Sequence, residues 1–250
     1  MSITNFSLIQ KIISSSILAF GIATSGIYIG NAIVKFRMLD RQVSVKGLAE
    51  KEIISDFATW TITIKVMANS LEECSGKIEQ DKKQIIEFLI SQGFEQEEIS
   101  LGNYLVNDLL AQTYRPEKPI ERYLISASII LKSNKVELVN KATQSQNILI
   151  QNGIIFENEG PFYEFTKFNY LKPEMLAEGI KNARLAAEKF VTDSGIKIGA
   201  LKKANQGTFL IAPVGVIETA NTYENEQLTR KSLFKKIRVV TTLEYFLKDN

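Results

Sequence analysis

The chain opens with a long uncharged stretch and then changes to regular alternation of apolar and polar positions. The 23 residues from Ile12 to Val34 carry no charged side chain. As a helix they would rise about 34 Å, which is enough to cross a hydrocarbon core of about 30 Å. A cleaved export signal is an alternative, since Ala23-Thr24-Ser25 offers a weak cleavage site, and a buried soluble helix is another. We favour an uncleaved transmembrane anchor, because the polar residues are scattered and form no stripe.

Small residues recur at four-residue spacing inside this stretch. Gly26 and Gly30 form a Gly-x-x-x-Gly pair, which Ala19 and Ala23 precede at the same spacing. Such a pattern lets two membrane helices approach closely, so it predicts a helix-packing surface. The alternative is that glycine is simply frequent in membrane helices.

After the anchor, strand and helix patterns follow one another. Residues 57–68 alternate almost strictly between apolar and polar, which predicts a strand with one buried face. Ser70 with Glu73 predicts a capping box at the start of the next helix. The strands are expected at about 42–50, 57–68, 99–107, 122–132, 154–167 (interrupted near Gly160-Pro161), 197–211 and 233–248. The helices are expected at about 70–91, 134–150 and 173–193.

The last of these helices has an amphipathic pattern. Pro173 is expected near its first turn and Gly195 just past its end. Its predicted buried stripe consists of Leu176, Ile180, Ala183, Ala187 and Phe190. Two polar segments are expected outside the regular elements: a proline-containing loop at 114–119 and a mobile excursion at 221–232.

Strands with one polar face, alternating with helices, indicate an α+β fold. We expect a two-layer sandwich with mostly antiparallel sheets and packed helices, preceded by one transmembrane helix. The expected organisation is a short tail at 1–11, the anchor at 12–34, a linker at 35–41 and one folded domain at 42–250, with halves at about 42–133 and 134–250.

Composition limits the available chemistry. The chain has no histidine, which removes the commonest general base and the usual Ser-His and Cys-His pairs. The single cysteine, Cys74, cannot form an intrachain disulfide, and we expect it to be a small buried apolar residue. Charge is nearly balanced, with 30 basic and 28 acidic residues, so no overall field indicates nucleic acid. We expect no catalytic residues, no cofactor and no metal site.

Three groups of residues are candidates for a functional site, and each has a simpler structural role as its alternative. Asp56 with Glu97 and Glu98 would suit paired-carboxylate hydrolysis, but acidic residues in turns are usually caps or solvated. The basic doublets would suit anionic lipid or nucleic acid, but such residues more often protect strand edges. These doublets are Lys202-Lys203, Arg230-Lys231 and Lys235-Lys236. An aromatic set would suit a ligand groove, although aromatic residues are more often core. It comprises Trp60, Phe162, Tyr163, Phe165 and Phe168.

Short motifs in a fixed order resemble the SIMPL domain (DUF541) family. Val43-Ser44-Val45-Lys46-Gly47 is followed by Asp56-Phe57-Ala58, and the run from Ala177 to Ala187 precedes Ser194-Gly195-Ile196-Lys197-Ile198-Gly199. The motif positions that we single out are Val43, Val45, Gly47, Asp56, Ala58, Ala183, Arg184, Gly195 and Gly199. We expect structural roles for them: Gly47 and Gly195 at a tight turn or positive φ, alanines forming a low-relief helix surface, and Arg184 pairing with Glu188.

The resemblance implies an exported protein of the bacterial envelope with an α+β fold, homo-oligomeric in some members, with a link to stress tolerance and no established reaction. The expected location is the inner membrane, single pass, with a periplasmic C-terminal domain. The count of positive charges favours the opposite orientation, with the C-terminal domain in the cytoplasm. Lys35, Arg37 and Arg41 follow the span, whereas only Lys11 precedes it. Large domains are translocated despite such flanking charge.

Three functions of different classes follow. We favour a non-enzymatic structural protein whose partners are other copies of itself and the lipid bilayer, without nucleic acid. The alternative is a periplasmic binding module for a peptide, a lipid or an unidentified small ligand. The third is an enzyme that uses only carboxylates, lysines or tyrosines.

Overall fold

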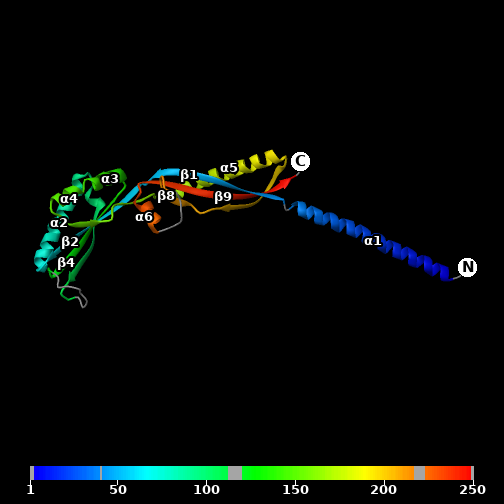
Figure 1. Ribbon diagram of the computed structural model, residues 1–250, viewed down its shortest axis with the longest axis horizontal. Helices are drawn as coiled ribbons and strands as arrows, with labels where there is room; N and C mark the ends of the chain where they lie inside the picture. The colour runs from blue at the N-terminus through cyan, green and yellow to red at the C-terminus, as the bar shows by residue number, and fades with distance from the viewer. Residues whose placement is uncertain (1–2, 40, 112–119, 217–222, 249–250) are drawn as a thin grey trace. The chain divides into compact units, whose positions relative to one another are not determined.

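The computed structural model describes residues 3–39, 41–111, 120–216 and 223–248 (Figure 1). The loop predicted at 114–119 lies outside the described residues. The chain divides into two units, described one at a time below. Unit 1 comprises Met1–Ala49, Leu176–Thr208 and Val239–Asn250, and unit 2 comprises Glu50–Met175 and Phe209–Arg238. The predicted division of the folded part near residue 133 stays a prediction.

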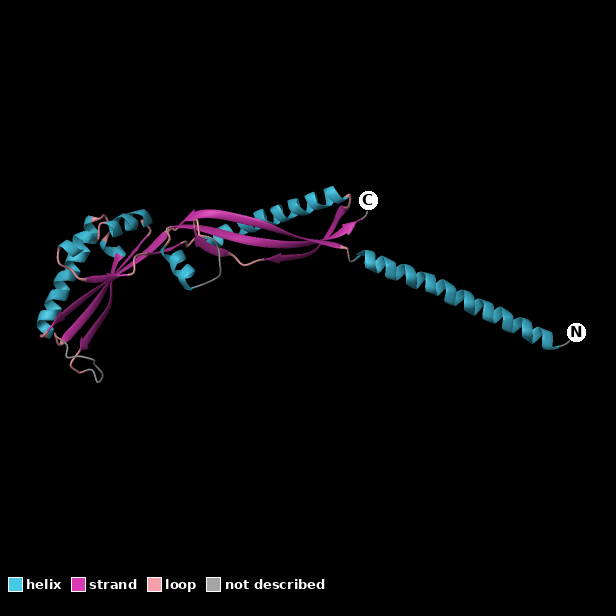
Figure 2. Cartoon of the chain, viewed as in Figure 1, coloured by secondary structure: helices cyan, strands magenta, loops and turns pink. Residues whose placement is uncertain are grey.

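Helices and strands follow one another along the chain, and the strands form two antiparallel sheets (Figure 2). The structure thus confirms the predicted α+β class. In chain order the elements are α1 (Ile3–Leu39), β1 (Gln42–Ile54), β2 (Phe57–Ala68), α2 (Leu71–Ser91), the 3-10 helix η1 (Gln96–Glu98), β3 (Ile99–Asp108), β4 (Tyr123–Ser133), α3 (Val136–Gln144), α4 (Asn147–Gln151), β5 (Phe156–Asn158), β6 (Phe162–Glu164), α5 (Phe168–Ser194), β7 (Lys197–Gln206), β8 (Leu210–Pro213), α6 (Tyr223–Lys231) and β9 (Phe234–Lys248).

Unit 2 is built on a sheet of order β3-β4-β2-β5, with β6 also paired to β2. The strict alternation of β2 places every second side chain in the core, and β4, paired antiparallel from Ala58↔Ser133 to Ala68↔Tyr123, does the same. Helix α2 packs on this face against β2 and β4. Trp60, Ile62 and Ile129 are fully buried there, and burial of each such side chain stabilises the fold by about 1.5–3 kcal/mol.

Unit 1 contains parts of β1 and β9, strand β7 and the C-terminal part of α5, and the strand order is β1-β9-β7. Val43 and Val45 of β1, with Leu243 of β9, form a small core against Ala183 and Ala187 of α5. Because α5 faces the sheet mainly with small residues, its backbone approaches the strands closely.

The buried stripe of α5 differs from the predicted one. The buried positions repeat every four residues, and they are Leu171, Met175, Gly179, Ala183, Ala187 and Val191. Ile180 is 46% exposed and Phe190 is 68% exposed, so the prediction was wrong at both. The prediction favoured large apolar residues, whereas the close approach of helix and strand selects small ones. The helix also begins at Phe168, which places Pro173 beyond the first turn.

Other element boundaries were predicted less well. The polar segment predicted as a mobile excursion contains a helix, α6. The helix predicted at 134–150 is two short helices, and the strand predicted at 154–167 is reduced to β5 and β6. The end predicted as one strand at 197–211 is divided into β7 and β8. Helix α2 begins after Ser70 as predicted, but the Ser70 side chain makes no capping hydrogen bond.

Candidate functional site

The apolar helix α1 is the first candidate surface. Residues Ile13–Ile33 are long and apolar enough to cross a membrane, and none of this segment is buried by the rest of the chain. A secretory signal would meet the same criterion. The helix continues beyond both ends of the predicted span, from Ile3 to Leu39. A bilayer would cover its exposed apolar side chains, which include Ile17, Phe20 and Tyr28.

The predicted small-residue surface of α1 is open. A methyl group built on Gly26 or Gly30 would meet no atom within 4 Å. Thr24 satisfies its hydroxyl within the helix by donating to the carbonyl oxygens of Phe20 and Gly21, at 2.9 and 3.0 Å. The Thr24 hydroxyl therefore has its acceptors within the helix itself. Whether the glycines pair with a second helix stays a prediction.

Gly47 lies in the middle of β1 and not at a turn, so the role expected for it was wrong. A Cβ at Gly47 would stand 2.0 Å from the carbonyl oxygen of Gly179 and 2.3 Å from the nitrogen of Ala183. Opposite it, a Cβ at Gly179 would stand 2.9 Å from Thr241 Oγ1. Both glycines are needed because α5 rests directly on the strands of unit 1.

The other motif positions of unit 1 lie on the C-terminal half of α5, just after its end, and on β7. Gly195 ends α5 with a φ of 69°, the left-handed conformation expected there. Gly199 lies in β7, where a Cβ would stand 2.8 Å from the carbonyl oxygen of Phe246 on β9. Arg184 Nε donates to Glu188 Oε1 at 2.9 Å, which confirms the predicted ion pair. These contacts are structural, and none of them presents a reactive group.

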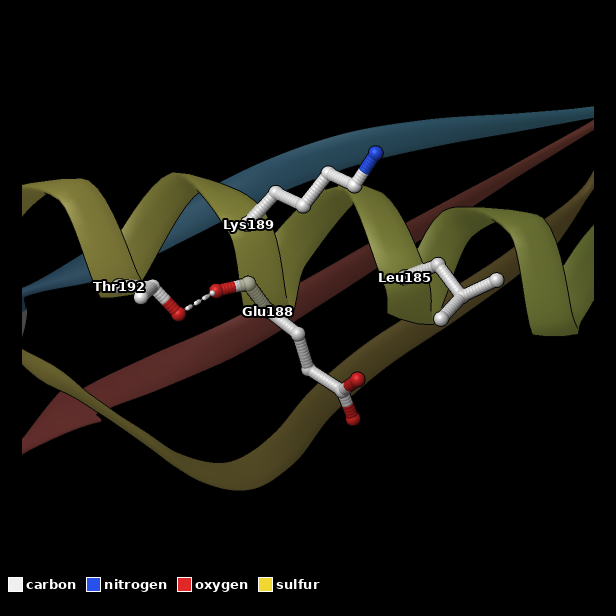
Figure 3. Close-up of a pocket in the computed structure, with 4 residues that line it drawn as sticks. All are labelled: Leu185, Glu188, Lys189 and Thr192. Carbon is white, nitrogen blue, oxygen red and sulfur yellow. Dashed lines mark hydrogen bonds between the residues drawn. The ribbon is translucent and has the colours of Figure 1, made fainter.

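A shallow groove runs beside the C-terminal half of α5 in unit 1. Its volume is about 640 Å³, and its lining includes Arg184, Val191, Ile196 and Tyr245. A second depression on the same helix is lined by Leu185, Glu188, Lys189 and Thr192 (Figure 3). In Figure 3 the Lys189 side chain and the Glu188 carboxylate point in opposite directions, and Thr192 Oγ1 donates to the Glu188 carbonyl oxygen at 2.7 Å. The larger groove is thus lined by apolar side chains such as Val191 and Ile196 and by the ion pair of Arg184 with Glu188.

The candidate acid/base residues of unit 2 have structural partners. The Asp56 carboxylate accepts hydrogen bonds from the backbone N–H and the hydroxyl of Thr166, at 2.7 and 3.1 Å. Glu98 accepts from the Glu95 N–H, from Ser133 Oγ at 2.6 Å and from Lys135 Nζ at 3.0 Å. Burial opposes ionisation of Glu98, but these hydrogen bonds outweigh it and hold its pKa below the ordinary value of 4.5. Both carboxylates therefore fix local backbone.

The two residues of the doublet Lys235-Lys236 have different surroundings. Lys235 is buried and its ammonium donates to the carbonyl oxygen of Tyr163, whereas Lys236 lies 3.9 Å from a carboxylate oxygen of Glu52. Burial lowers the pKa of Lys235, although the negative charge of Glu164 opposes this shift. Arg230 stacks over the ring of Phe162. Sequence reasoning missed the burial of Lys235 because its neighbour Lys236 made the pair resemble a solvated edge.

The aromatic residues considered for a ligand groove are divided between the core and half-buried positions. Trp60 and Tyr163 belong to the core of unit 2, together with the motif residue Ala58. Phe168 packs edge-to-face on Phe209, with ring centroids 5.3 Å apart. Burial raises the pKa of Tyr163 to about 12. Its hydroxyl and that of Ser55 are buried and lack a hydrogen-bond partner in the described part of the chain.

Over the described ranges, no three Cys, Asp or Glu side chains gather closely enough to hold a metal ion. Cys74 is buried and its thiol donates to the carbonyl oxygen of Val66 at 3.2 Å, so it packs as expected.

The edges of the sheets are the remaining candidate surfaces. β1 and β7 end the strand order of one sheet, and β3 ends that of the other. β1 carries four charged residues and β7 carries three lysines, which deter pairing with another strand. β3 carries one charged residue, Asp108, at its last position, where Arg122 pairs with it at 2.9 Å. Of these three edge strands, β3 is therefore the one without charged residues along most of its length, a feature that the uncharged run of its sequence could have revealed.

The fold and these surfaces define an α+β protein with one helix able to cross a membrane. The model of the SIMPL family, described as a protein of unknown function (DUF541), matches residues 43–229. The match covers more than half of the chain, so the chain belongs to the SIMPL family, and the predicted resemblance is confirmed. No curated protein matches the chain.

Proposed function

We propose that the protein is a membrane-anchored, non-enzymatic structural protein of the bacterial envelope that assembles into a large symmetric homo-oligomer. The observation that carries the proposal is the unburied apolar surface of α1 from Ile13 to Ile33. Its large side chains are more than half exposed, an arrangement that water opposes and a bilayer satisfies. An anchored body held at one surface meets other copies of itself at high effective concentration.

The chemistry of the folded body supports a structural role. Asp56 and Glu98 hold backbone groups and neighbouring side chains, and the buried ammonium of Lys235 binds a main-chain carbonyl. The surfaces left over are strand edges, which are the natural contacts of an assembly. In a closed ring or shell, each copy would contribute the same edge.

For location we propose the inner membrane, with α1 as a single span and the folded body in the periplasm. Family membership supports this through what the family implies about export, and a role in stress tolerance rests on the same implication. The positive residues Lys35, Arg37 and Arg41 after the span oppose this orientation.

A binding module for a peptide, a lipid or a small ligand is the second candidate. The groove beside α5, with Val191, Ile196 and Tyr245 in its lining, favours it. The Arg184–Glu188 pair at its wall would orient a polar group of the ligand. The groove is confined to unit 1.

The anchor is tested by washing membranes with alkaline carbonate. The full chain should stay in the membrane pellet with its whole mass of 28.1 kDa. The matched control replaces Ile22 and Ile27 with arginine, because each central arginine costs about 2.5–3.5 kcal/mol of insertion and should release the chain. Recovery of the unaltered protein in the soluble fraction, shortened by about two dozen residues, would contradict the anchor.

A further inference from the structure

We propose that β3 is a self-pairing edge: β3 of one copy pairs antiparallel with β3 of a second copy and joins two sheets into one. This inference rests on the proposed homo-oligomer and names one of its contacts. β3 ends the strand order β3-β4-β2-β5, so within the described residues β4 is its one strand partner. Its other edge presents backbone N–H and C=O groups that another strand can bind.

The side chains of β3 are unusually apolar for a free edge. Leu101 is 60% exposed, Leu105 is 56% exposed and Val106 is 49% exposed. The pairing to β4 places Leu101, Tyr104 and Val106 opposite the core residues Ile129, Ala127 and Ile125. They therefore lie on the same face as the core, but the contacts of α2 on the sheet are with β2 and β4. A neighbouring copy would extend that layer over them.

The sequence of β3 is complementary to itself, which favours a second copy as the occupant. The register shift of the strand lies between Leu101 and Tyr104, and the strand is regularly paired with β4 from Tyr104 to Asp108. An antiparallel pair centred on Leu105 places Leu105 opposite its own copy and Tyr104 opposite Val106, within this regular part. Pairs of an aromatic and a β-branched residue are favourable across strands.

In a two-fold contact, if residue i of one copy contacts residue j of the other, then residue j of the first copy contacts residue i of the second. The register centred on Leu105 meets this condition. No charged residue lies between Ile99 and Asn107, so two identical edges approach without repulsion. The single charge at the end, Asp108, is already neutralised by Arg122. The edge strands β1 and β7 carry four charged residues and three lysines, respectively.

The test replaces Leu105 with lysine in one form of the full chain and with glutamate in another. Like charges would stand opposite one another at the centre of the contact, about 4.5–5.5 Å apart, so each variant alone should fall at least twofold in particle mass. When the two forms are co-expressed with different tags, the opposite charges should restore the particle mass, and each form should recover the other. Lys46→Glu on the edge strand β1 is the matched control and should leave the mass unchanged.

Four outcomes decide the matter. If the particle mass is restored in the co-expressed sample, β3 pairing is supported. If neither single variant changes the particle mass, β3 pairing is overturned but the proposed homo-oligomer is not. Loss in both variants without restoration also overturns it and indicates that a different segment occupies the edge. A monomeric unaltered protein removes the proposed function itself.

A conservative variant covers the case in which a charged residue prevents folding. Leu105→Cys should form a disulfide-linked dimer under mild oxidation, because the residue faces its own copy at a separation close to that of a disulfide. Leu101→Cys is the control on the same strand, since the register carries its partner position beyond the end of β3. The native thiol of Cys74 is buried and should not interfere. Equal cross-linking of the two variants, or none at Leu105→Cys, would overturn the register.

Discussion

At the scale of single residues, buried and half-buried polar groups in this protein hold backbone in place. Glu98 is the clearest case, because its carboxylate joins the N-terminus of η1, the end of β4 at Ser133 and the ammonium of Lys135. Its side chain is 18% exposed, so solvent screens these contacts only partly. The sequence indicated Glu97 and Glu98 together as candidate acid/base residues. In the structure Glu97 is exposed, whereas Glu98 is half-buried and hydrogen-bonded.

Replacing Glu98 with glutamine should lower the free energy of unfolding by about 1 kcal/mol near neutral pH, because charge-assisted hydrogen bonds are lost. The folded-state pKa of Glu98 is lowered, so its stabilisation is present above the ordinary value of 4.5 and is lost as pH falls through the folded value. The difference between variant and unaltered protein should therefore vanish in acid. Denaturant titrations at several pH values measure it.

The control for this experiment is Glu97→Gln, the exposed neighbour, which should change stability by less than about 0.5 kcal/mol. If the effect of Glu98→Gln persisted unchanged in acid, the carboxylate would not be the source of the stabilisation.

At the scale of elements, the contact of α5 with β1 and β9 organises unit 1. The stripe at every fourth position brings Gly179, Ala183 and Ala187 onto the strands, and Gly47 receives the helix backbone. This arrangement explains why a glycine occupies the middle of an otherwise alternating strand. It also explains the small size of the core in unit 1, where valines and alanines replace larger side chains.

Gly47→Ala should therefore destabilise the protein by about 3 kcal/mol, because the added methyl group would meet backbone atoms that have no rotamer to change. Gly76→Ala is the matched control. Gly76 is exposed within α2 and a Cβ there meets nothing within 4 Å, so alanine should stabilise by up to about 1 kcal/mol. Midpoints of chemical unfolding compare the two, and equal effects would refute the close contact.

Periodicity predicted the strong elements and failed where tertiary packing decides. The twelve residues of β2 alternate so regularly that the strand and its buried face follow from the pattern. The stripe of α5 could not be predicted in the same way, because apolar Ile180 and Phe190 compete with Gly179 and Val191 for the inner positions. The close approach of β1 to the α5 backbone determines which of these residues face inward. Likewise, the burial of Lys235 depends on the carbonyl of Tyr163, which is distant in sequence.

The candidate surfaces show the same limit. The composition of the anchor and the absence of charge along β3 are readable from the sequence. That β3 ends its sheet, and that α2 contacts β2 and β4, requires the strand order and the helix placement.

At the scale of the whole molecule, one chain combines an apolar helix that the protein itself does not cover with a folded body whose sheets end in open strands. The proposal joins these two features: the bilayer covers the helix and neighbouring copies cover an edge. Family membership is shown by the match over residues 43–229, whereas the assembly is our proposal.

Native mass spectrometry of the full chain, extracted from membranes in mild detergent, tests the proposal most directly because it weighs the particle and then its released subunit. We expect a particle of several subunits, each retaining 28.1 kDa. A particle with the mass of one subunit, or a subunit lighter by the mass of the N-terminal helix, would contradict the account.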